Sequence, residues 1–364
     1  MSKEKNNLLI AASGTGGHIF PALAVSKKVE NYWNVHWLGI QNRLDSKFVP
    51  RKYNLLTLNI ETPNKNIFLV FKYFKILFST FHVFKILKEK KIGLVFTTGG
   101  YISAPTILAA KLLKIPVIIH ESNLIPGMVT KYLGFLCELV LIGFKETNSY
   151  LKNCKTIFTG TPLREQFYKS NPLPDWVPKG TEPLLIIMGG SQGAKAINEI
   201  FFQSLEFLIN RKFRIVHIIG ECDSNKYRIK KSNNYVQKRF TNEIAALMQN
   251  CDLVISRSGS GTINELIQTG KPSILIPYPN SKNNHQEKNA MILSSIGGSI
   301  LINQNKLSKV VFEETLRRIF KLKLKKGKPQ YKILDLMKNN MKINYYQRPV
   351  KKIKKLINYF LKEF

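Results

Sequence analysis

Two glycine-rich turns with the composition of anion-binding loops lie about half a chain apart. The first is GTGGH at residues 14–18, and the second is GGSQG at residues 189–193. Each follows a short apolar run and precedes a stretch with the pattern of a helix. Glycine lets the backbone approach a phosphate closely, and the N–H groups and dipole at a helix N-terminus favour negative charge. Two such turns predict twin α/β domains that hold phosphate-bearing ligands in the cleft between them.

His18 is the strongest candidate for acid–base chemistry. It opens the helix after the first glycine turn, where an imidazole could deprotonate a hydroxyl group or donate a hydrogen bond to an anion. His120 and His285 also fall in polar clusters at predicted strand ends, and Glu121 is the rival candidate for the base. The other three histidines lie outside such clusters, and a lone histidine is more often structural than catalytic.

The glycine turns do not match the common nucleotide motifs. The second lacks the GK[ST] ending of a P-loop, and the first is not a GxGxxG motif because Ile19 stands where the last glycine belongs. A dinucleotide site also needs an acidic residue after the second strand, and Asp45 fits that position poorly. Nicotinamide chemistry is therefore disfavoured, and no cofactor is expected.

Glu265 lies one turn into a predicted helix that starts near Ser260. An ionised carboxylate only accepts hydrogen bonds, so Glu265 suits two neighbouring sugar hydroxyls. The run from Thr262 to Glu265 also fits a capping box, in which the glutamate satisfies the helix N-terminus. The two interpretations are compatible.

The elements that must position these residues alternate between strands and helices. Apolar runs predict strands at residues 8–13, 35–40, 55–60, 94–98, 116–120, 139–143 and 156–160. A second series is predicted at residues 184–188, 214–219, 235–240, 253–256 and 273–277. Nearly continuous apolar strands separated by helices are typical of doubly wound parallel sheets.

A proline-rich stretch at residues 171–182 predicts a linker between the two series. The expected domains are residues 1–165 and 184–335, with the linker at 166–183. A basic C-terminal helix is expected at residues 336–364 and could pack back on the N-terminal domain. For its closing part, residues 351–364, a packed helix with a solvated basic face is favoured over membrane contact.

The composition favours a two-domain cytoplasmic protein. A length of 364 residues is long for one core, and the four cysteines lack metal-ligand spacing, so no metal site is expected. No stretch reaches the roughly 18 uncharged apolar residues of a membrane-spanning helix. The net charge of +33 favours an anionic partner, namely nucleic acid, a membrane surface or a phosphorylated substrate. Compositional drift toward lysine would account for about half of this excess.

One predicted helix, at residues 62–88, has an unusual composition. It carries phenylalanines and lysines at short intervals and no acidic side chain. Aromatic rings beside lysines suit a helix at a lipid interface, with the cations near anionic headgroups. A helix buried between a sheet and a neighbour fits the pattern equally well.

The chemistry-bearing residues fall into six ordered motifs between about residue 8 and residue 300. They are residues 14–22 (GTGGHIFPA), 99–103 (GGYIS), 120–123 (HESN), 189–194 (GGSQGA), 257–265 (RSGSGTINE) and 285–290 (HQEKNA). Together they resemble the MurG family of bacterial peptidoglycan N-acetylglucosaminyltransferases. Each motif alone is only moderately specific, and the ordered set is specific.

The resemblance implies a GT-B fold, in which two doubly wound Rossmann-like domains face each other across a cleft, and catalysis without a metal or cofactor. The implied reaction is inverting transfer of GlcNAc from UDP-GlcNAc to the C4 hydroxyl of MurNAc in undecaprenyl-pyrophosphoryl-MurNAc-pentapeptide, which is lipid I. The product is lipid II, for peptidoglycan synthesis. The alternative is another GT-B enzyme with a lipid acceptor such as diacylglycerol.

The resemblance also assigns roles to residues. In the C-terminal domain it implies that Glu265 holds the ribose hydroxyls and that the backbone at Phe240 and Thr241 meets the uracil. The implied donor site comprises Ser191, Gln192, Thr241, Ser260, Gly261, Thr262, Glu265, His285 and Gln286. The implied contribution of the N-terminal domain comprises Thr15, Gly16, Gly17 and His18 at the acceptor pyrophosphate and the reacting hydroxyl, and Asn123 and Arg164 at the cleft. We expect His18 to act as the base, with Glu121 or another carboxylate as the rival.

The sequence departs from the family pattern in three places, one of them a pair of residues. Ser122 stands where glutamine is frequent, Thr161 stands where asparagine is common, and Ser260-Gly261 replaces a more apolar pair. These departures affect the details of sugar and phosphate contacts.

A lipid acceptor implies a peripheral enzyme on the cytoplasmic side of the cell inner membrane, with a role in cell shape and cell division. It favours residues 66–88 as a docking surface for anionic lipids. Contact with other cell-wall synthesis proteins stays open.

Two further classes are weighed against this expectation. A nucleic-acid-binding protein would explain the charge, but no segment resembles an RNA-binding aromatic motif and the lysines are scattered, so no nucleic-acid partner is expected. A membrane-associated scaffold without activity is the other class, and UDP-GlcNAc binding would argue against it.

Overall fold

The computed structural model describes residues 5–41, 48–59, 69–190, 193–220, 233–321, 323–325, 328–342 and 348–362. The chain divides into two compact units. Unit 1 comprises Met1–Arg164 together with Gln347–Phe364, and unit 2 comprises Glu165–Tyr346. Each unit is built around its own parallel sheet.

Unit 1 contains a seven-stranded sheet in the order β3-β2-β1-β4-β5-β6-β7. The strands are β1(Asn7–Ala11), β2(Asn34–Ile40), β3(Leu55–Leu58), β4(Ile92–Thr97), β5(Val117–Glu121), β6(Leu139–Ile142) and β7(Thr156–Phe158). Leu8, Leu9 and Ile10 of the central strand β1 are completely buried, as the continuous apolar run predicts. The strand order reverses between β1 and β4, which is the switch point where doubly wound sheets bind ligands.

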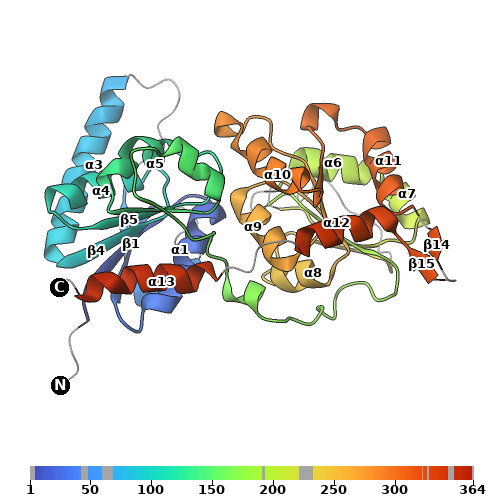
Figure 1. Cartoon of the computed structure of the whole chain (residues 1–364), viewed down its shortest axis with the longest axis horizontal. Helices are drawn as coiled ribbons and strands as arrows, with labels where there is room; N and C mark the ends of the chain where they lie inside the picture. Colours follow the sequence, from blue (N-terminus) through green and yellow to red (C-terminus); the bar gives the residue numbers. More distant parts are fainter. Residues whose placement is uncertain are drawn as a thin grey trace. The chain divides into compact units, whose positions relative to one another are not determined.

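Helices cover both faces of this sheet (Figure 1). They are α1(Gly16–Val29), α3(Leu69–Glu89), α4(Ser103–Leu112), α5(Met128–Leu133) and α13(Pro349–Tyr359), with short 3-10 turns η1(Arg51–Tyr53), η2(Gly134–Leu136), η3(Lys145–Tyr150) and η7(Phe360–Lys362). Val83 of α3 packs with Leu9 in the core under one face. Ile19 of α1 and Ile353 of α13 pack with Leu8 under the other face.

The C-terminal segment differs from the single basic helix expected at residues 336–364. It contains the end of α12(Lys332–Lys342), which belongs to unit 2, and α13, which packs against α1 in unit 1. Buried Ile353 and Ile357 fix α13 there, and the Trp33 indole donates a hydrogen bond of 3.2 Å to Asn358 Oδ1. Pro349 at the start of α13 cannot continue a preceding helix, so the chain begins a new one.

Unit 2 contains a six-stranded sheet in the order β10-β9-β8-β11-β12-β13. The strands are β8(Leu184–Met188), β9(Arg214–Ile218), β10(Tyr235–Lys238), β11(Leu253–Ser256), β12(Ser273–Leu275) and β13(Ser299–Leu301). The helices are α6(Lys195–Gln203), α7(Leu205–Asn210), α8(Ile244–Asn250), α9(Ser260–Thr269), α10(His285–Ser295), α11(Lys309–Ile319) and α12, with η4(Glu165–Tyr168), η5(Lys282–Asn284) and η6(Gln304–Lys306). Its switch point lies between β8 and β11.

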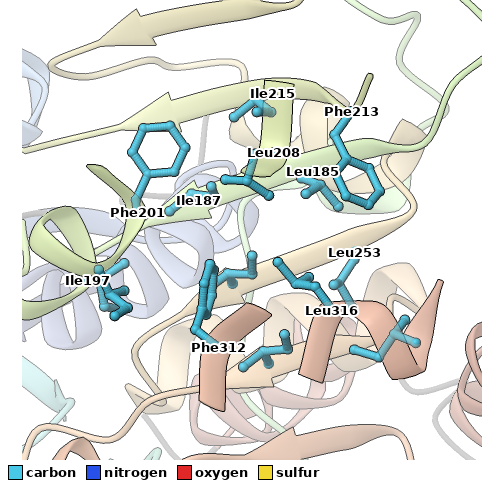
Figure 2. Packing of buried hydrophobic residues seen from close by; sticks show 14 of the residues in the cluster. Leu185, Ile187, Ile197, Phe201, Leu208, Phe213, Ile215, Leu253, Phe312 and Leu316 are labelled. Carbon is cyan, nitrogen blue, oxygen red and sulfur yellow. The ribbon is translucent and has the colours of Figure 1, made fainter. Parts of the chain in front are cut away.

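The core of unit 2 is one buried cluster of residues from its strands and helices. Leu185 and Ile187 of β8 lie between Ile197 and Phe201 of α6 and Phe312 of α11 in one buried cluster (Figure 2). Figure 2 also shows Leu208, Phe213, Ile215, Leu253 and Leu316 in this cluster. The two doubly wound sheets predicted from the sequence are therefore confirmed.

Three details differ from the sequence expectation. The edge strand β13 has only three residues, too few for an alternating or continuous apolar run to stand out. A small antiparallel hairpin, β14(Lys323–Lys325) with β15(Lys328–Gln330), lies in a lysine-rich part where the sequence analysis predicts no strand. The stretch expected as a linker is attached to unit 2, where Asn171 accepts and donates hydrogen bonds with Gln249 and Asn250 of α8.

Candidate functional site

The candidate residues of unit 1 come together because β1, β4 and β5 are neighbours in the sheet. Ala11 pairs with Thr97, so the chain leaves β1 and β4 at the same edge. The loop after β1 carries residues 14–18, the loop after β4 carries residues 98–101, and β5 ends at Glu121. Parallel strands present these carboxyl ends on one side, where ligands bind in open α/β sheets.

The first glycine turn forms the N-terminus of α1. Gly14 has φ of +100°, which L side chains rarely adopt, and Thr15 is the extended residue before the helix. A Cβ on Gly16 would lie 2.8 Å from Cε2 of Phe20, so a side chain there would displace that ring. Thr15 makes no side-chain capping bond, so the first turn of α1 leaves backbone N–H groups uncapped by its side chain.

His18 is half-buried on the first turn of α1 and is held by the loop after β4. Its Nδ1 lies 2.7 Å from the carbonyl oxygen of Thr98. The hydroxyl of Thr98 donates a hydrogen bond of 3.0 Å to the carbonyl oxygen of His18. The imidazole therefore has a defined position at the edge of the sheet.

Glu121 is 5% exposed, and its carboxylate is surrounded by hydrogen-bond donors. One oxygen accepts from the backbone and side-chain nitrogens of Asn123, at 2.9 and 3.1 Å. The other accepts from the Gly127 backbone and the Thr130 hydroxyl, both at 2.8 Å. An ionised carboxylate has about four acceptor positions, so this one is filled by the protein. The geometry favours a role in holding the loop at residues 122–127 and the first turn of α5.

His120, the residue before Glu121 in β5, is completely buried. Its Nε2 is 3.0 Å from the Gly160 carbonyl, and its Nδ1 is 3.2 Å from the Ser122 hydroxyl. Burial lowers the pKa of His120 to about 4, since the cation would lose its hydration. A neutral, enclosed imidazole here ties the end of β5 to the loop after β7.

Arg164 is the last residue of the first segment of unit 1. Its guanidinium lies over the Phe20 ring of α1, at 4.8 Å from the ring centroid. This contact connects the end of the loop after β7 to the helix that carries His18. Asn123, the other residue expected from this unit, is held by Glu121 and by the Thr147 hydroxyl, which donates to its carbonyl at 3.1 Å.

The second glycine turn follows β8 at the switch point of unit 2. Gly190 and Gly193 have φ of +87° and +82°, and a Cβ on Gly189 would lie 2.1 Å from the Ala194 nitrogen. Only glycine can therefore occupy position 189 in this backbone. Ser191 and Gln192, the candidate phosphate-binding residues, lie outside the described residues.

The neighbouring loop after β11 leads into α9, which carries Ser260, Gly261, Thr262 and Glu265. Gly259 is the extended residue before this helix, and Asn264 donates a hydrogen bond of 2.8 Å to the Ser260 carbonyl. Because β8 and β11 are paired, the N-terminus of α9 and the second glycine turn leave the sheet at the same edge. The side chains of this first turn accordingly share an edge with the glycine turn.

Gln286 and His285 begin α10, and Gln286 is joined to the loop after β11. The Ser258 hydroxyl donates to the Gln286 carbonyl at 2.7 Å, and the Gln286 side-chain oxygen accepts from the Tyr278 nitrogen at 2.9 Å. His285 Nδ1 lies 2.7 Å from the Lys282 carbonyl. The two candidates at the start of α10 are thus positioned by backbone contacts.

Arg257 is a buried cation that sequence reasoning placed in a motif without a role of its own. Its guanidinium donates to the carbonyls of Ile276 and Pro277 and to Gln304, at 3.0, 3.1 and 2.6 Å. Burial lowers its pKa from the ordinary value. All three partners are neutral, so the positive charge is retained at this edge of the sheet.

Thr241 lies at the other end of the sheet edge, after β10. It is buried, and its hydroxyl accepts from the Glu243 nitrogen at 3.1 Å. Glu243 also accepts from the Trp176 indole at 2.7 Å, and the Lys238 ammonium lies 3.6 Å from the Trp176 ring centroid. Sequence reasoning missed Trp176, because a tryptophan in a proline-rich stretch gives no signal of a partner 67 residues away.

Helix α3 presents one apolar face to solvent. Val83 and Leu87 are buried against unit 1, whereas Leu77, Phe78 and Phe81 are 65%, 77% and 58% exposed. The Lys85 ammonium lies 4.8 Å from the centroid of the Phe81 ring. Residues 62–68 and the side chains of residues 69–74, including Phe74, lie outside the description. Among the described helices, none is long and apolar enough to span a bilayer.

Comparisons with known proteins agree with this arrangement. Residues 8–142 match the glycosyltransferase family 28 N-terminal domain, and residues 184–345 match its C-terminal domain. Within the described residues, no group of three or more histidine, cysteine, aspartate or glutamate side chains could hold a metal ion.

Two relatives are similar over nearly the whole chain. A protein of Prochlorococcus marinus (strain MIT 9515) is 78% identical over 364 residues, which is 100% of both chains. A protein of Prochlorococcus marinus (strain NATL1A) is 45% identical over 96% of this chain and 98% of its own. Both are named UDP-N-acetylglucosamine--N-acetylmuramyl-(pentapeptide) pyrophosphoryl-undecaprenol N-acetylglucosamine transferase.

Solved structures share the architecture. The crystal structure of Acinetobacter baumannii MurG superposes with a TM-score of 0.74 at 25% identity, covering 98% of this chain and 100% of that one. A glycosyltransferase of kitacinnamycin superposes with a TM-score of 0.71 at 13% identity, covering 98% and 99%, and supports the fold alone.

Proposed function

The chain belongs to glycosyltransferase family 28, and from this premise we propose that it transfers GlcNAc from UDP-GlcNAc to the MurNAc C4 hydroxyl of lipid I, giving lipid II. The observation that carries this proposal is 78% identity over the full length of a relative named for that reaction. The GT-B fold, with two doubly wound units, supports it. The alternative of a diacylglycerol acceptor is not favoured, because no relative cited above is named for it.

We assign the donor to unit 2. The glycine turn after β8 and the N-terminus of α9 would offer N–H groups to the UDP diphosphate, and the buried charge of Arg257 would add to this field. Glu265 would accept from the ribose hydroxyls, Thr241 lies in the loop assigned to the uracil, and His285 and Gln286 would contact the sugar. Ser191, Gln192, Ser260, Gly261 and Thr262 complete the proposed donor site.

We assign the acceptor to unit 1. Thr15, Gly16 and Gly17 would bind its pyrophosphate at the N-terminus of α1, which is a general anion site. His18 would take the proton from the C4 hydroxyl while the carbon–oxygen bond forms at the anomeric carbon and UDP leaves with the bonding electron pair. Glu121 is bound by four donors, so we assign it to holding Asn123 and not to the proton transfer.

The reaction also requires stabilisation of the negative charge that develops on the leaving group. UDP departs as an anion, and a preorganised donor at developing negative charge is worth about 3 kcal/mol. The helix N-termini of unit 2 would provide this stabilisation, and Arg164 is the proposed contribution from unit 1.

The deciding experiment is UDP release from UDP-GlcNAc in the presence of lipid I, diacylglycerol or no acceptor. The proposed function requires release that depends on lipid I, with lipid II as product. Release that depends on diacylglycerol would favour the rival transferase, and the absence of release with both acceptors would contradict the proposal.

The lipid acceptor also places the enzyme at a membrane. We propose that it is peripheral to the cytoplasmic face of the inner membrane, with the exposed face of α3 against anionic lipids. Peptidoglycan synthesis would connect it to cell shape and cell division, and other cell-wall synthesis proteins are candidate partners.

A further inference from the structure

The loop after β4 makes two hydrogen bonds with His18, one to the imidazole and one to the main chain. We propose that Thr98 is a positioning residue that fixes both the orientation and the tautomer of His18. The structural part of this inference stands on the contacts alone. Its catalytic consequence rests on the function proposed above.

The tautomer follows from the chemistry of the partner. His18 Nδ1 lies 2.7 Å from the Thr98 carbonyl oxygen, and a carbonyl can only accept a hydrogen bond. In the neutral imidazole, Nδ1 must then carry the hydrogen and Nε2 must carry the lone pair. Within the part of the chain that the structure describes, Nε2 makes no hydrogen bond. This is the form that a proton acceptor requires.

The backbone of His18 is held by the same residue. The Thr98 hydroxyl donates to the His18 carbonyl oxygen at 3.0 Å, so Thr98 bonds to both the ring and the main chain. One contact alone would allow the ring to turn about its side-chain bonds while the helix stayed in place. Two contacts from one residue restrict the helix position and the ring together.

Two glycines after Thr98 complete the arrangement. Gly99 and Gly100 have φ of +84° and +82°, so the chain turns directly against the imidazole. A Cβ on Gly99 would lie 3.7 Å from Cε1 of His18, and a Cβ on Gly100 would lie 3.6 Å from Cδ2 and Nε2. A side chain at either position would strain the backbone, and its Cβ would lie in van der Waals contact with the ring.

The sheet explains why residues 80 apart meet in this way. Strands β1 and β4 are paired in parallel on either side of the switch point, with Ala11 opposite Thr97. Thr98 is therefore the first residue after β4, and it lies beside the first turn of α1. The proposed base and its positioning residue belong to different strand–helix segments but share one edge.

Thr97 offers a matched control. It is also a buried threonine, and its hydroxyl donates to the Ala11 carbonyl at 2.6 Å. It makes no hydrogen bond to His18 among the described residues. Thr97→Val and Thr98→Val each remove one buried hydroxyl that bonds to a backbone carbonyl, and only the second removes a contact of His18.

The first measurement is the ¹⁵N spectrum of histidine-labelled full-length protein at neutral pH, with His18→Gln assigning the signal. The inference requires the Nδ1–H tautomer at His18 in the wild-type protein and in Thr98→Ser. Thr98→Val keeps the main-chain carbonyl that bonds to Nδ1, so the tautomer should persist in this variant and in Thr97→Val. A wild-type Nε2–H tautomer would overturn the inference.

The second measurement is steady-state turnover with UDP-GlcNAc and lipid I. Thr98→Val should lower kcat about tenfold and leave the KM for UDP-GlcNAc within about twofold, because a misplaced base slows chemistry without affecting donor binding. Thr98→Ser should restore kcat, and Thr97→Val should leave it unchanged. Equal losses in the two valine variants would overturn the positioning role. If the Nδ1–H tautomer is found but the enzyme does not turn over lipid I, the structural assignment stands and the proposed function is contradicted.

Discussion

His18 and Glu121 lie at the same edge of one sheet but have opposite surroundings. His18 has one ring nitrogen bound and is half-buried, whereas both carboxylate oxygens of Glu121 are bound twice. A general base needs an unoccupied lone pair within reach of the hydroxyl that it deprotonates. At the scale of single residues, hydrogen bonding therefore separates two candidates that the sequence leaves side by side.

We expect His18→Gln to lower kcat by about 10²- to 10⁴-fold, which is the usual contribution of a general base. The KM for UDP-GlcNAc should stay close to the wild-type value, because the donor is assigned to unit 2. Steady-state kinetics with lipid I measures both quantities. Wild-type turnover in this variant would exclude His18 from the proton transfer.

For Glu121→Gln we expect a loss of stability. The glutamine carboxamide has an NH₂ group in place of one carboxylate oxygen, and that oxygen accepts two hydrogen bonds in Glu121. An NH₂ group cannot accept, so both buried hydrogen bonds at that atom are lost. The free energy of unfolding in urea should fall by about 1–3 kcal/mol. Glu138→Gln, which removes an exposed ion pair with Lys155, is the control and should cost less than about 1 kcal/mol. Full stability with abolished turnover would return Glu121 to the role of a base.

At the scale of elements, α3 combines two environments on one helix. Its buried side packs against α4 and the core of unit 1, and its outer side carries large apolar side chains and lysines. The pattern of phenylalanines predicts apolar character all round, so the sequence alone could not say which residues face solvent. The packing of Val83 and Leu87 decides this.

Changing Leu77, Phe78 and Phe81 to serine should abolish sedimentation of the protein with anionic vesicles. Wild-type binding should weaken as salt is raised, because dissolved ions screen the attraction between the lysines and the anionic headgroups. The control is the pair Val310→Ser and Leu336→Ser, which removes exposed apolar side chains from α11 and α12 of unit 2. Equal vesicle binding by the triple variant would contradict the proposed docking face.

At the scale of the whole molecule, each unit contains one completely buried histidine. Burial lowers the pKa of His120 in unit 1 to about 4 and of His217 in unit 2 to about 3. Both values lie below the ordinary value of 6.5 that the unfolded chain would show. Between these limits the unfolded state binds more protons than the folded state, so stability falls as the pH falls.

Each unit should therefore lose about 1.4 kcal/mol of unfolding free energy per pH unit below pH ~6.5. Urea unfolding at pH 7 and at pH 5 tests this in a range above the titration of ordinary carboxylates. In His217→Gln the transition of unit 2 should lose this pH dependence. The prediction would be contradicted if the wild-type protein unfolded at the same urea concentration at both pH values.

The sequence by itself determined the two series of strands, the two glycine turns and the edge of each sheet where the candidate residues lie, His18 and Glu121 in unit 1 and Glu265 in unit 2. These features depend on local pattern: apolar runs make buried strands, and glycine followed by a helical stretch makes an anion-binding turn. Parallel strands then place every loop after a strand on one side. Sequence reasoning could therefore predict the fold and the approximate location of the candidate site.

Only the tertiary structure decided how those residues are held. The Thr98 contact with His18 and the Trp176 bond to Glu243 join residues from separate loops, and no local pattern encodes such pairs. The division of the C-terminal segment between α12 and α13 depends in the same way on which core accepts each apolar face. Local spacing fixes elements, whereas hydrogen-bond and packing partners are chosen only when the chain has folded.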